Sequence, residues 1–206
     1  MNYILFTFAL IASLYIIFCF FHKFIFLRDP YRSIPSGKNI VSPADGKVIE
    51  IKEVKGKQRV KKGMVGKIHT LTNDVAKDCY IVSIFMSPFN VHINRSPLPG
   101  KVTKVSHIKG KFLPVNSFEN GLLNEKNEIL IKNKTIGNVK VIQIAGFLAR
   151  RIECFVHKDD NLDRGQRIGL INLGSQVTLI LPKTVKLKVK KGDKVKAGSS
   201  ILATYK

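Results

Sequence analysis

A serine, a histidine and an aspartate at separate places in the chain have side chains suited to nucleophilic or acid–base chemistry. Ser175 follows Gly174 at the start of an alternating run, so an extended chain over residues 175–181 would aim its hydroxyl at the apolar, inward face. The glycine permits strained backbone angles there. His92 is the side-chain type best suited to proton transfer near neutral pH, and Asp45 lies in the turn-forming sequence SPADG.

Each of these residues also has a purely structural interpretation. Gly-Ser pairs are common in turns, and aspartate is common there for local hydrogen bonding. In the sequence NVHIN, strand alternation places Asn90, His92 and Asn94 on the face opposite Val91 and Ile93. A lone histidine in such a place is more often a surface or satisfied polar residue than a catalytic one. A catalytic interpretation is favoured only because Ser175, His92 and Asp45 occur in the same chain.

Short apolar runs separated by Gly, Pro, Asn and Asp fill the chain from Ile40 onward and predict strands rather than helices. We expect a mainly β domain of the α+β class, preceded by an N-terminal transmembrane helix. The expected strands are 47–54, 80–86, 101–107, 128–132, 140–144, 177–181 and 185–189.

Two internal repeats refine this fold prediction. SPADGKV at 42–48 is echoed by SPLPGKV at 96–102. Asp160, Leu162, Gly165 and Ile168 recur with the same spacing as Asp193, Val195, Gly198 and Ile201. Paired β units of this type suggest a barrel-sandwich-like architecture with pseudo-repeats. Asp160 and Asp193 are then structural rather than catalytic candidates.

The N-terminus predicts a membrane anchor. Tyr3 to Phe21 contains no charge and no proline, and at about 1.5 Å per residue it spans a bilayer core of roughly 30 Å. A cleaved signal peptide would need a basic segment before this stretch and a small-residue cleavage site, and neither is present. Basic residues follow the stretch instead, so the positive-inside rule places the remainder in the cytoplasm. We expect an anchor and juxtamembrane segment over 1–30 and a second domain over 31–206, at the cell (inner) membrane.

The charge balance points to a polyanionic partner. The chain has 35 Lys and Arg against 14 Asp and Glu, a formal net charge of +21, although a lysine-rich genome would also produce this excess. A nucleic-acid binder would interleave aromatic with basic residues, whereas the phenylalanines here cluster in the anchor. We therefore expect an anionic phospholipid membrane as partner and no nucleic acid. The three cysteines, Cys19, Cys79 and Cys154, are far apart and offer neither a disulfide framework nor a metal site.

From about Ile40 to Lys206 the chain resembles the phosphatidylserine decarboxylase proenzyme family, in its short bacterial and archaeal branch. FLRDP at 26–30 is also similar to the segment that follows the anchor in that family. The order and spacing of the matching pieces make the resemblance specific. They are VSPADGKV at 41–48, MSPFNVHINRSPLPGKV at 86–102, QIAGFLARRI at 143–152, RGQRIGLINLGS at 164–175 and VKKGDKVKAGSSILA at 189–203.

The resemblance implies a carboxy-lyase whose only cofactor is a covalent pyruvoyl group made from Ser175. The family cuts itself between the residues that match Gly174 and Ser175, which would give a β chain ending at 174 and an α chain of 175–206 that stay together as a heterodimer, with or without further oligomerisation. By similarity, His92 and Asp45 would supply the base. Phosphatidylserine would then form a Schiff base with the pyruvoyl group and leave as phosphatidylethanolamine.

Two departures from the family pattern matter. The family commonly has Asp where this chain has Asn90, so a carboxylate that assists maturation in relatives is absent. Long-form relatives have a second histidine where this chain has Arg95, and its role is not carried over. Arg150 and Arg151 are weak candidates for binding the substrate carboxylate or phosphate, and at most one of these strand neighbours can line a pocket.

The main alternative is a non-enzymatic, membrane-anchored barrel-sandwich adaptor of the membrane-fusion-protein type, because segment 189–203 also resembles lipoyl-type domains. Such adaptors usually carry a long coiled-coil hairpin, and no sustained heptads occur here.

Overall fold

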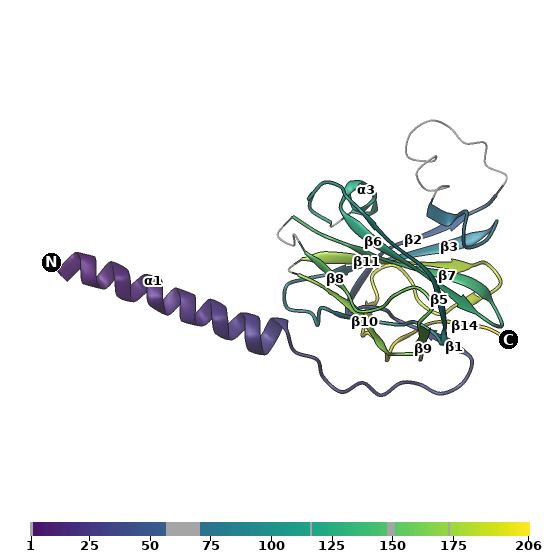
Figure 1. Ribbon diagram of the computed structural model, residues 1–206, viewed down its shortest axis with the longest axis horizontal. Helices are drawn as coiled ribbons and strands as arrows, with labels where there is room; N and C mark the ends of the chain where they lie inside the picture. Colours follow the sequence, from purple (N-terminus) through teal and green to yellow (C-terminus); the bar gives the residue numbers. More distant parts are fainter. Residues whose placement is uncertain (1, 57–70, 116, 148–150, 173) are drawn as a thin grey trace.

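The computed structural model describes residues 2–56, 71–115, 117–147, 151–172 and 174–206. It has a long N-terminal helix that projects from a body built mostly of strands (Figure 1). Helix α1, Asn2–Phe20, continues into one turn of π-helix, η1, Phe21–Phe26. By length and composition Tyr3–Phe26 could cross a membrane, and its most apolar part is not buried against the body.

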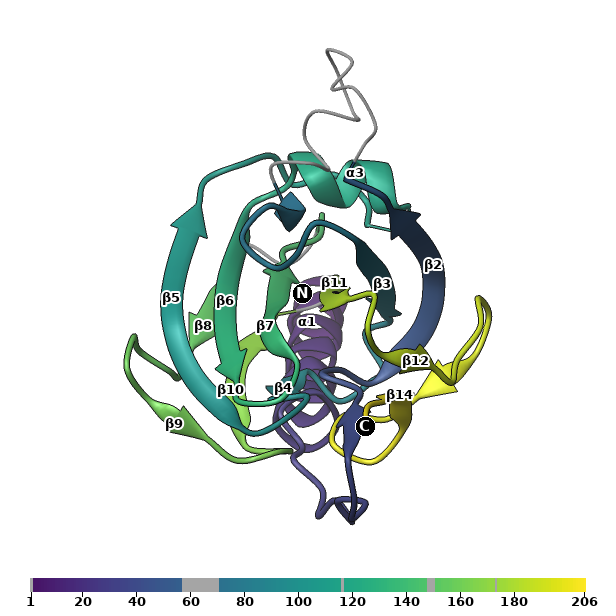
Figure 2. The same cartoon turned by 90° about the vertical axis from the view of Figure 1, so that its right-hand side faces the viewer.

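An antiparallel sheet of eight described strands forms the centre of the body. In spatial order these are β13 (Lys194–Val195), β2 (Gly46–Val54), β3 (Cys79–Met86), β11 (Ser175–Pro182), β7 (Gly137–Ile144), β6 (Lys126–Asn133), β5 (Gly100–Ile108) and β9 (Asn161–Leu162). Figure 2 shows this sheet curling, with β2 and β5 on opposite sides and helix α3 (Phe118–Leu123) across one end.

Two smaller antiparallel sheets complete the described strands. One has the order β1 (Asn39–Val41), β14 (Ile201–Thr204), β12 (Lys186–Leu187), and the other β4 (Ile93–Arg95), β10 (Arg167–Ile171), β8 (Ile152–Cys154). The mainly β class with one apolar N-terminal helix is thus confirmed. The division into domains at residue 30 stays a prediction.

Strand β11 lies at the centre of the large sheet and is buried on both faces. Val177, Leu179 and Leu181 pack into the main core, as the alternation predicts. Ile180 packs instead into a second core beneath α3, together with Phe118. Polar residues on this second face are also buried, and hydrogen bonds compensate for their burial. Gln176 donates to Thr178 Oγ1 at 3.0 Å, and the Thr178 hydroxyl lies 2.9 Å from that of Ser83.

The expected strands all have counterparts, and two predictions need correction. The run 185–189 pairs only over Lys186–Leu187. In NVHIN the strand begins only at Ile93, so Asn90 and His92 lie in the loop before β4. The alternation there misleads because a hydrogen-bonded turn occupies residues 87–90, with the Asn90 amide bonded to the Ser87 carbonyl oxygen at 2.9 Å.

The hydrogen bonds of the repeated aspartates support their structural interpretation. The His157 amide donates to Asp160 Oδ2 at 2.8 Å, and the Lys190 amide donates to Asp193 Oδ2 at 2.9 Å. Each carboxylate therefore caps its own turn three residues back, in the same way in both repeats.

Candidate active site

The Gly174–Ser175 peptide lies at the start of β11, between the ends of β3 and β7. The sheet register places Ser175 opposite Met86 and Gln176 opposite Ile144. Gly174 has a φ of 65°, in the left-handed region that favours glycine. Ser175 is fully buried, and its hydroxyl donates to Met86 Sδ at 3.4 Å. Because a thioether is a weak acceptor, this contact leaves the hydroxyl oxygen free to act as a nucleophile.

Gly146 lies directly against the carbonyl oxygen of Gly174. A β-carbon added at Gly146 would lie 1.8 Å from that oxygen, a distance no real side chain adopts. The same antiparallel register that pairs Gln176 with Ile144 places these two glycines opposite one another. Sequence reasoning missed Gly146, although its position in the QIAGFLARRI motif was a signal. The fold thus favours glycine at position 174, because of its backbone angles, and at position 146, because of its close approach to the Gly174 carbonyl oxygen.

His92 is fully buried in the loop that follows β3. Its Nδ1 lies 2.8 Å from the carbonyl oxygen of Asn90. A carbonyl oxygen only accepts, so Nδ1 of the neutral ring carries the proton and Nε2 carries the lone pair. Within the described residues Nε2 has no hydrogen-bond partner. His92 therefore presents an unused basic nitrogen inside the protein.

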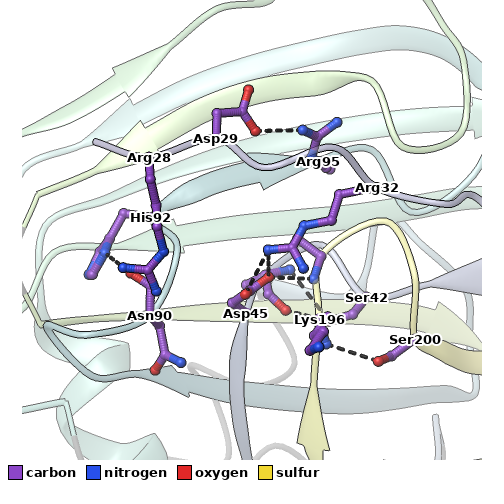
Figure 3. Close-up of polar contacts among 12 residues, drawn as sticks. Arg28, Asp29, Arg32, Ser42, Asp45, Asn90, His92, Arg95, Lys196 and Ser200 are labelled. Carbon is purple, nitrogen blue, oxygen red and sulfur yellow. Dashed lines mark hydrogen bonds and ion pairs between the residues drawn. The ribbon is translucent and has the colours of Figure 1, made fainter. Parts of the chain in front are cut away.

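The surroundings of His92 keep it neutral. Burial, with a smaller contribution from the positive charge of Arg28, lowers the pKa of His92 to about 4, against the opposing effect of the Asn90 carbonyl. The Phe26 ring packs on the imidazole with centroids 4.2 Å apart. Phe26 is the last residue of η1, and Arg28, which Figure 3 shows near His92, follows it by two residues. A neutral imidazole at physiological pH is the form that accepts a proton.

Asn90 acts as a turn residue. Its Oδ1 accepts from the Ser87 amide at 2.8 Å and from the Ser87 hydroxyl at 2.9 Å. An amide oxygen accepts these bonds as a carboxylate would, so the turn that carries His92 closes without an aspartate.

Asp45 is engaged by partners other than His92. Arg32 donates from one nitrogen to both carboxylate oxygens, at 2.8 and 2.9 Å, and the Ala197 amide donates to Oδ1 at 2.7 Å. Figure 3 shows His92 and Asp45 in separate hydrogen-bonded groups. The structure thus brings Arg32 to Asp45, which sequence reasoning did not foresee, and direct pairing of Asp45 with His92 stays a prediction.

A chain of buried amides leads to the same methionine sulfur as Ser175. Asn127 donates to Gln143 Oε1 at 3.0 Å, and Gln143 donates to Asn94 Oδ1 at 2.9 Å. Asn94 in turn donates to Met86 Sδ at 3.7 Å. These amides fix the orientation of one another and of the thioether beneath the serine. Sequence reasoning missed Gln143, although it begins the QIAGFLARRI motif, and Asn127, which lies in none of the quoted motifs.

The structure describes only one of the two arginine candidates. Arg150 lies outside the described residues. Arg151 has a largely exposed side chain whose Nε lies 3.6 Å from Glu153. Arg95 serves the fold: it donates to the Gly165 carbonyl at 2.9 Å and pairs with Asp29 at 2.6 Å.

Comparison with known proteins matches most of the chain to one family. The family model described as phosphatidylserine decarboxylase matches residues 20–203. A phosphatidylserine decarboxylase proenzyme of Syntrophus aciditrophicus is 44% identical over 181 residues, covering 87% of this chain and 78% of the relative. One from Chlorobium phaeobacteroides is 43% identical over 183 residues, covering 87% of this chain and 77% of the relative.

An archaeal protein is similar to the same degree. The protein named as an archaetidylserine decarboxylase proenzyme of Methanocaldococcus jannaschii is 42% identical over 182 residues, covering 86% of this chain and 87% of its own length. Among solved structures, glucose permease IIA from Mycoplasma capricolum has a TM-score of 0.39 at 14% identity, covering 80% of this chain and 93% of its own, which is too low for any conclusion. The family match over 20–203 and these identities show that the chain belongs to the phosphatidylserine decarboxylase family.

Proposed function

We propose that this protein cuts itself between Gly174 and Ser175 and then decarboxylates phosphatidylserine to phosphatidylethanolamine. The observation that carries the proposal is a buried serine hydroxyl after a left-handed glycine, in a fold that also buries a histidine whose Nε2 has no hydrogen-bond partner among the described residues. The family's decarboxylase and proenzyme names support the same activity and favour it over a non-enzymatic adaptor.

Self-cleavage begins at the Ser175 hydroxyl. In our proposal His92 Nε2 takes the hydroxyl proton while Oγ attacks the Gly174 carbonyl carbon. The C–N bond breaks, the Ser175 nitrogen receives a proton, and an ester joins Gly174 to Ser175. Loss of the Ser175 α-proton then breaks the Cβ–Oγ bond and releases the Gly174 carboxylate. Water replaces the nitrogen of the resulting unsaturated residue, and ammonia leaves.

The residues around the new chain end fit a pyruvoyl group. Ser175, its precursor, is fully buried beside a thioether and an amide chain that offer no competing nucleophile. The pyruvoyl group supplies a carbonyl that accepts the electrons released with carbon dioxide. In our proposal His92 returns a proton to the substrate carbon, since its lowered pKa would make the protonated ring a ready donor.

Asp45, Arg150 and Arg151 complete the proposed site with narrower support. Asp45 would orient His92 or set the local charge, and its burial with Arg32 keeps a carboxylate in this part of the fold. Either arginine would bind the substrate carboxylate or phosphate. The exposed guanidinium of Arg151 is available for such a contact.

The remaining proposals concern assembly and location. The 1–174 and 175–206 chains would stay together, because β11 is hydrogen-bonded between β3 and β7. The short strands around the curled sheet support a barrel-sandwich-like architecture. The N-terminal helix would hold the body at the cytoplasmic face of the cell membrane, where the positive charge meets anionic phospholipid.

The intact mass of the purified full chain tests the proposed function. We expect two chains whose summed mass equals that of the precursor plus one water and minus one ammonia, and the smaller chain should resist sequencing from its N-terminus. Ser175→Ala should remain one chain and release no carbon dioxide from phosphatidylserine, because no hydroxyl remains to attack. An active protein that consists of one uncut chain would overturn the proposal.

A further inference from the structure

The two most exposed phenylalanines of the described body lie at one edge of the large sheet. Phe89 follows β3 and Phe147 follows β7, and their side chains are 69% and 64% exposed. Both strands end beside Ser175, because the register pairs Ser175 with Met86 and Gln176 with Ile144. We call this the cleavage-site edge: the ends of β3 and β7 and the start of β11.

The membrane-spanning stretch ends at the same edge. The Phe21 ring meets the Phe89 ring edge-on, with centroids 5.8 Å apart. Arg28 donates to the Phe89 carbonyl oxygen at 2.6 Å and to the Ile25 carbonyl oxygen at 2.6 Å, so it ties the Phe89 loop to the last turn of η1. Figure 1 shows α1 projecting from this side of the body, and in Figure 2 it lies behind the sheet. If α1 crosses a bilayer, Phe89 lies at the bilayer surface.

The chemistry of the neighbouring side chains suits the boundary between headgroups and acyl chains. Phe24 in η1 is 58% exposed, and Lys23 beside it lies 5.7 Å from the Phe24 ring. Arg151 is exposed a few residues beyond Phe147. Phenylalanine and other apolar side chains with lysine and arginine beside them are typical of segments that lie in a membrane interface, where the apolar groups enter the lipid and the cations meet phosphate.

We propose that the cleavage-site edge docks on the phospholipid bilayer, with Phe89 and Phe147 inserted into it. The inference rests on the proposed function and deepens it: a lipid headgroup would reach the buried Ser175 position without its acyl chains leaving the bilayer. The bilayer is the occupant that the contact between Phe89 and the end of the membrane-spanning stretch favours. A second copy of this chain on the same edge is the competing outcome.

The absence of tryptophan from the chain provides the test. Phe89→Trp and Phe147→Trp each create a single fluorophore in the full-length protein. Each variant would be reconstituted in vesicles of phosphatidylcholine and phosphatidylglycerol, with and without bromine on the acyl chains. We expect a blue-shifted emission maximum and a loss of intensity with the brominated lipid for both variants.

Tyr205→Trp is the matched control, because the C-terminus lies on the side of the body away from α1 (Figure 1). It is held on the same vesicles by the same helix, and its emission should not respond to bromine. Equal emission with both lipids at positions 89 and 147 would overturn the inference. A blue shift that instead depends on protein concentration in detergent would assign the edge to a second copy.

The mass of each variant is measured in the same samples. Cleaved chains with unquenched tryptophans reject the docking edge and leave the proposed function standing. Quenched tryptophans in an uncut chain reject the proposed function and leave the docking edge standing.

Discussion

Residues 42–48 and 96–102 make the same structure twice and differ at one position that matters. In each, the serine hydroxyl donates to a carbonyl two residues on, Ser42 to Ala44 and Ser96 to Leu98, both at 2.7 Å. The final valine amide of each segment donates to the carbonyl of a repeated aspartate, at 2.8 to 2.9 Å. A repeated glycine amide also donates back to each serine carbonyl, at 2.8 Å in both.

The two segments differ where Asp45 of the first corresponds to Pro99 of the second. Asp45 accepts from Arg32 and from the Ala197 amide. Pro99 offers only its backbone carbonyl, which accepts from Asn133 at 2.8 Å. The hydrogen bonds that both segments make hold the backbone together, whereas the Asp45 carboxylate, which only the first segment has, adds a negative charge. Positions that obey the repeat should therefore govern stability, and positions outside it should govern chemistry.

The largest expected effect is at His92, which lies outside the repeat. His92→Ala should slow self-cleavage, decarboxylation or both by about 10²–10⁴-fold, because a positioned acid–base group contributes that much. Time-resolved intact mass measures the first step and carbon dioxide release the second. A His92→Ala protein with near-normal rates in both would remove His92 from the mechanism.

Gly146→Ala should slow self-cleavage by about 10²-fold, because the new methyl group would displace the Gly174 carbonyl by a large fraction of an ångström or more. Hydroxylamine separates the steps, since it cleaves an accumulated ester but not an amide. We expect no hydroxylamine-dependent cleavage, because the attack itself is impaired.

Gly110→Ala is the matched control for Gly146→Ala. Its β-carbon would lie 2.4 Å from the backbone of Asn124, a comparable clash near α3. Equal slowing by both variants, with equal loss of thermal stability, would reduce Gly146 to a packing residue.

The lowered pKa of His92 should make the free energy of unfolding depend on pH. The pKa of His92 is lowered in the folded protein, so the unfolded chain binds the proton more tightly. The contribution of neutral His92 is fully present above about pH 6.5 and is lost as the pH falls toward 4, by about 3 kcal/mol in total. The measurement is chemical unfolding of full-length Ser175→Ala, with and without His92→Ala, across this range. Parallel curves for the two proteins would contradict the prediction.

Asp45→Asn should slow self-cleavage tenfold or more, while Arg32→Ala should slow it less. The asparagine keeps an acceptor for the Ala197 amide but loses the charge that the repeat does not share. A tenfold effect corresponds to about 1.4 kcal/mol. Identical rates for the two variants would mean that Asp45 serves only to hold the segment containing Arg32.

The smallest expected effect lies within the repeat. Asp160→Ala and Asp193→Ala each remove one turn hydrogen bond and should each cost about 1 kcal/mol of unfolding free energy. Self-cleavage should remain at the original rate. Slower self-cleavage in either variant would contradict the expectation that positions within the repeat govern stability rather than chemistry.

The parts of the fold that depend on local pattern could be predicted from the sequence. The alternation of apolar residues predicted most of the strands and the inward face of β11. The repeats predicted that Asp160 and Asp193 have structural roles. The pattern could not show that Gly146 lies against Gly174, because that depends on the register of strands far apart in the chain. It also could not show that Phe26 buries His92 or that Arg32 pairs with Asp45. Both contacts come from residues 26–32, for which the sequence analysis predicted no contact with the candidate site.

The contact between Phe26 and His92 changes what it means to shorten this protein. A chain beginning at Ser33 would be easier to handle in water, but it would lack both the ring that covers the imidazole and the Arg28 charge beside it. Its histidine would face solvent and titrate nearer its ordinary pKa. If His92 acts as we propose, the N-terminal segment helps to enclose the catalytic histidine as well as to anchor the body, and a shortened, soluble protein would be a different catalyst.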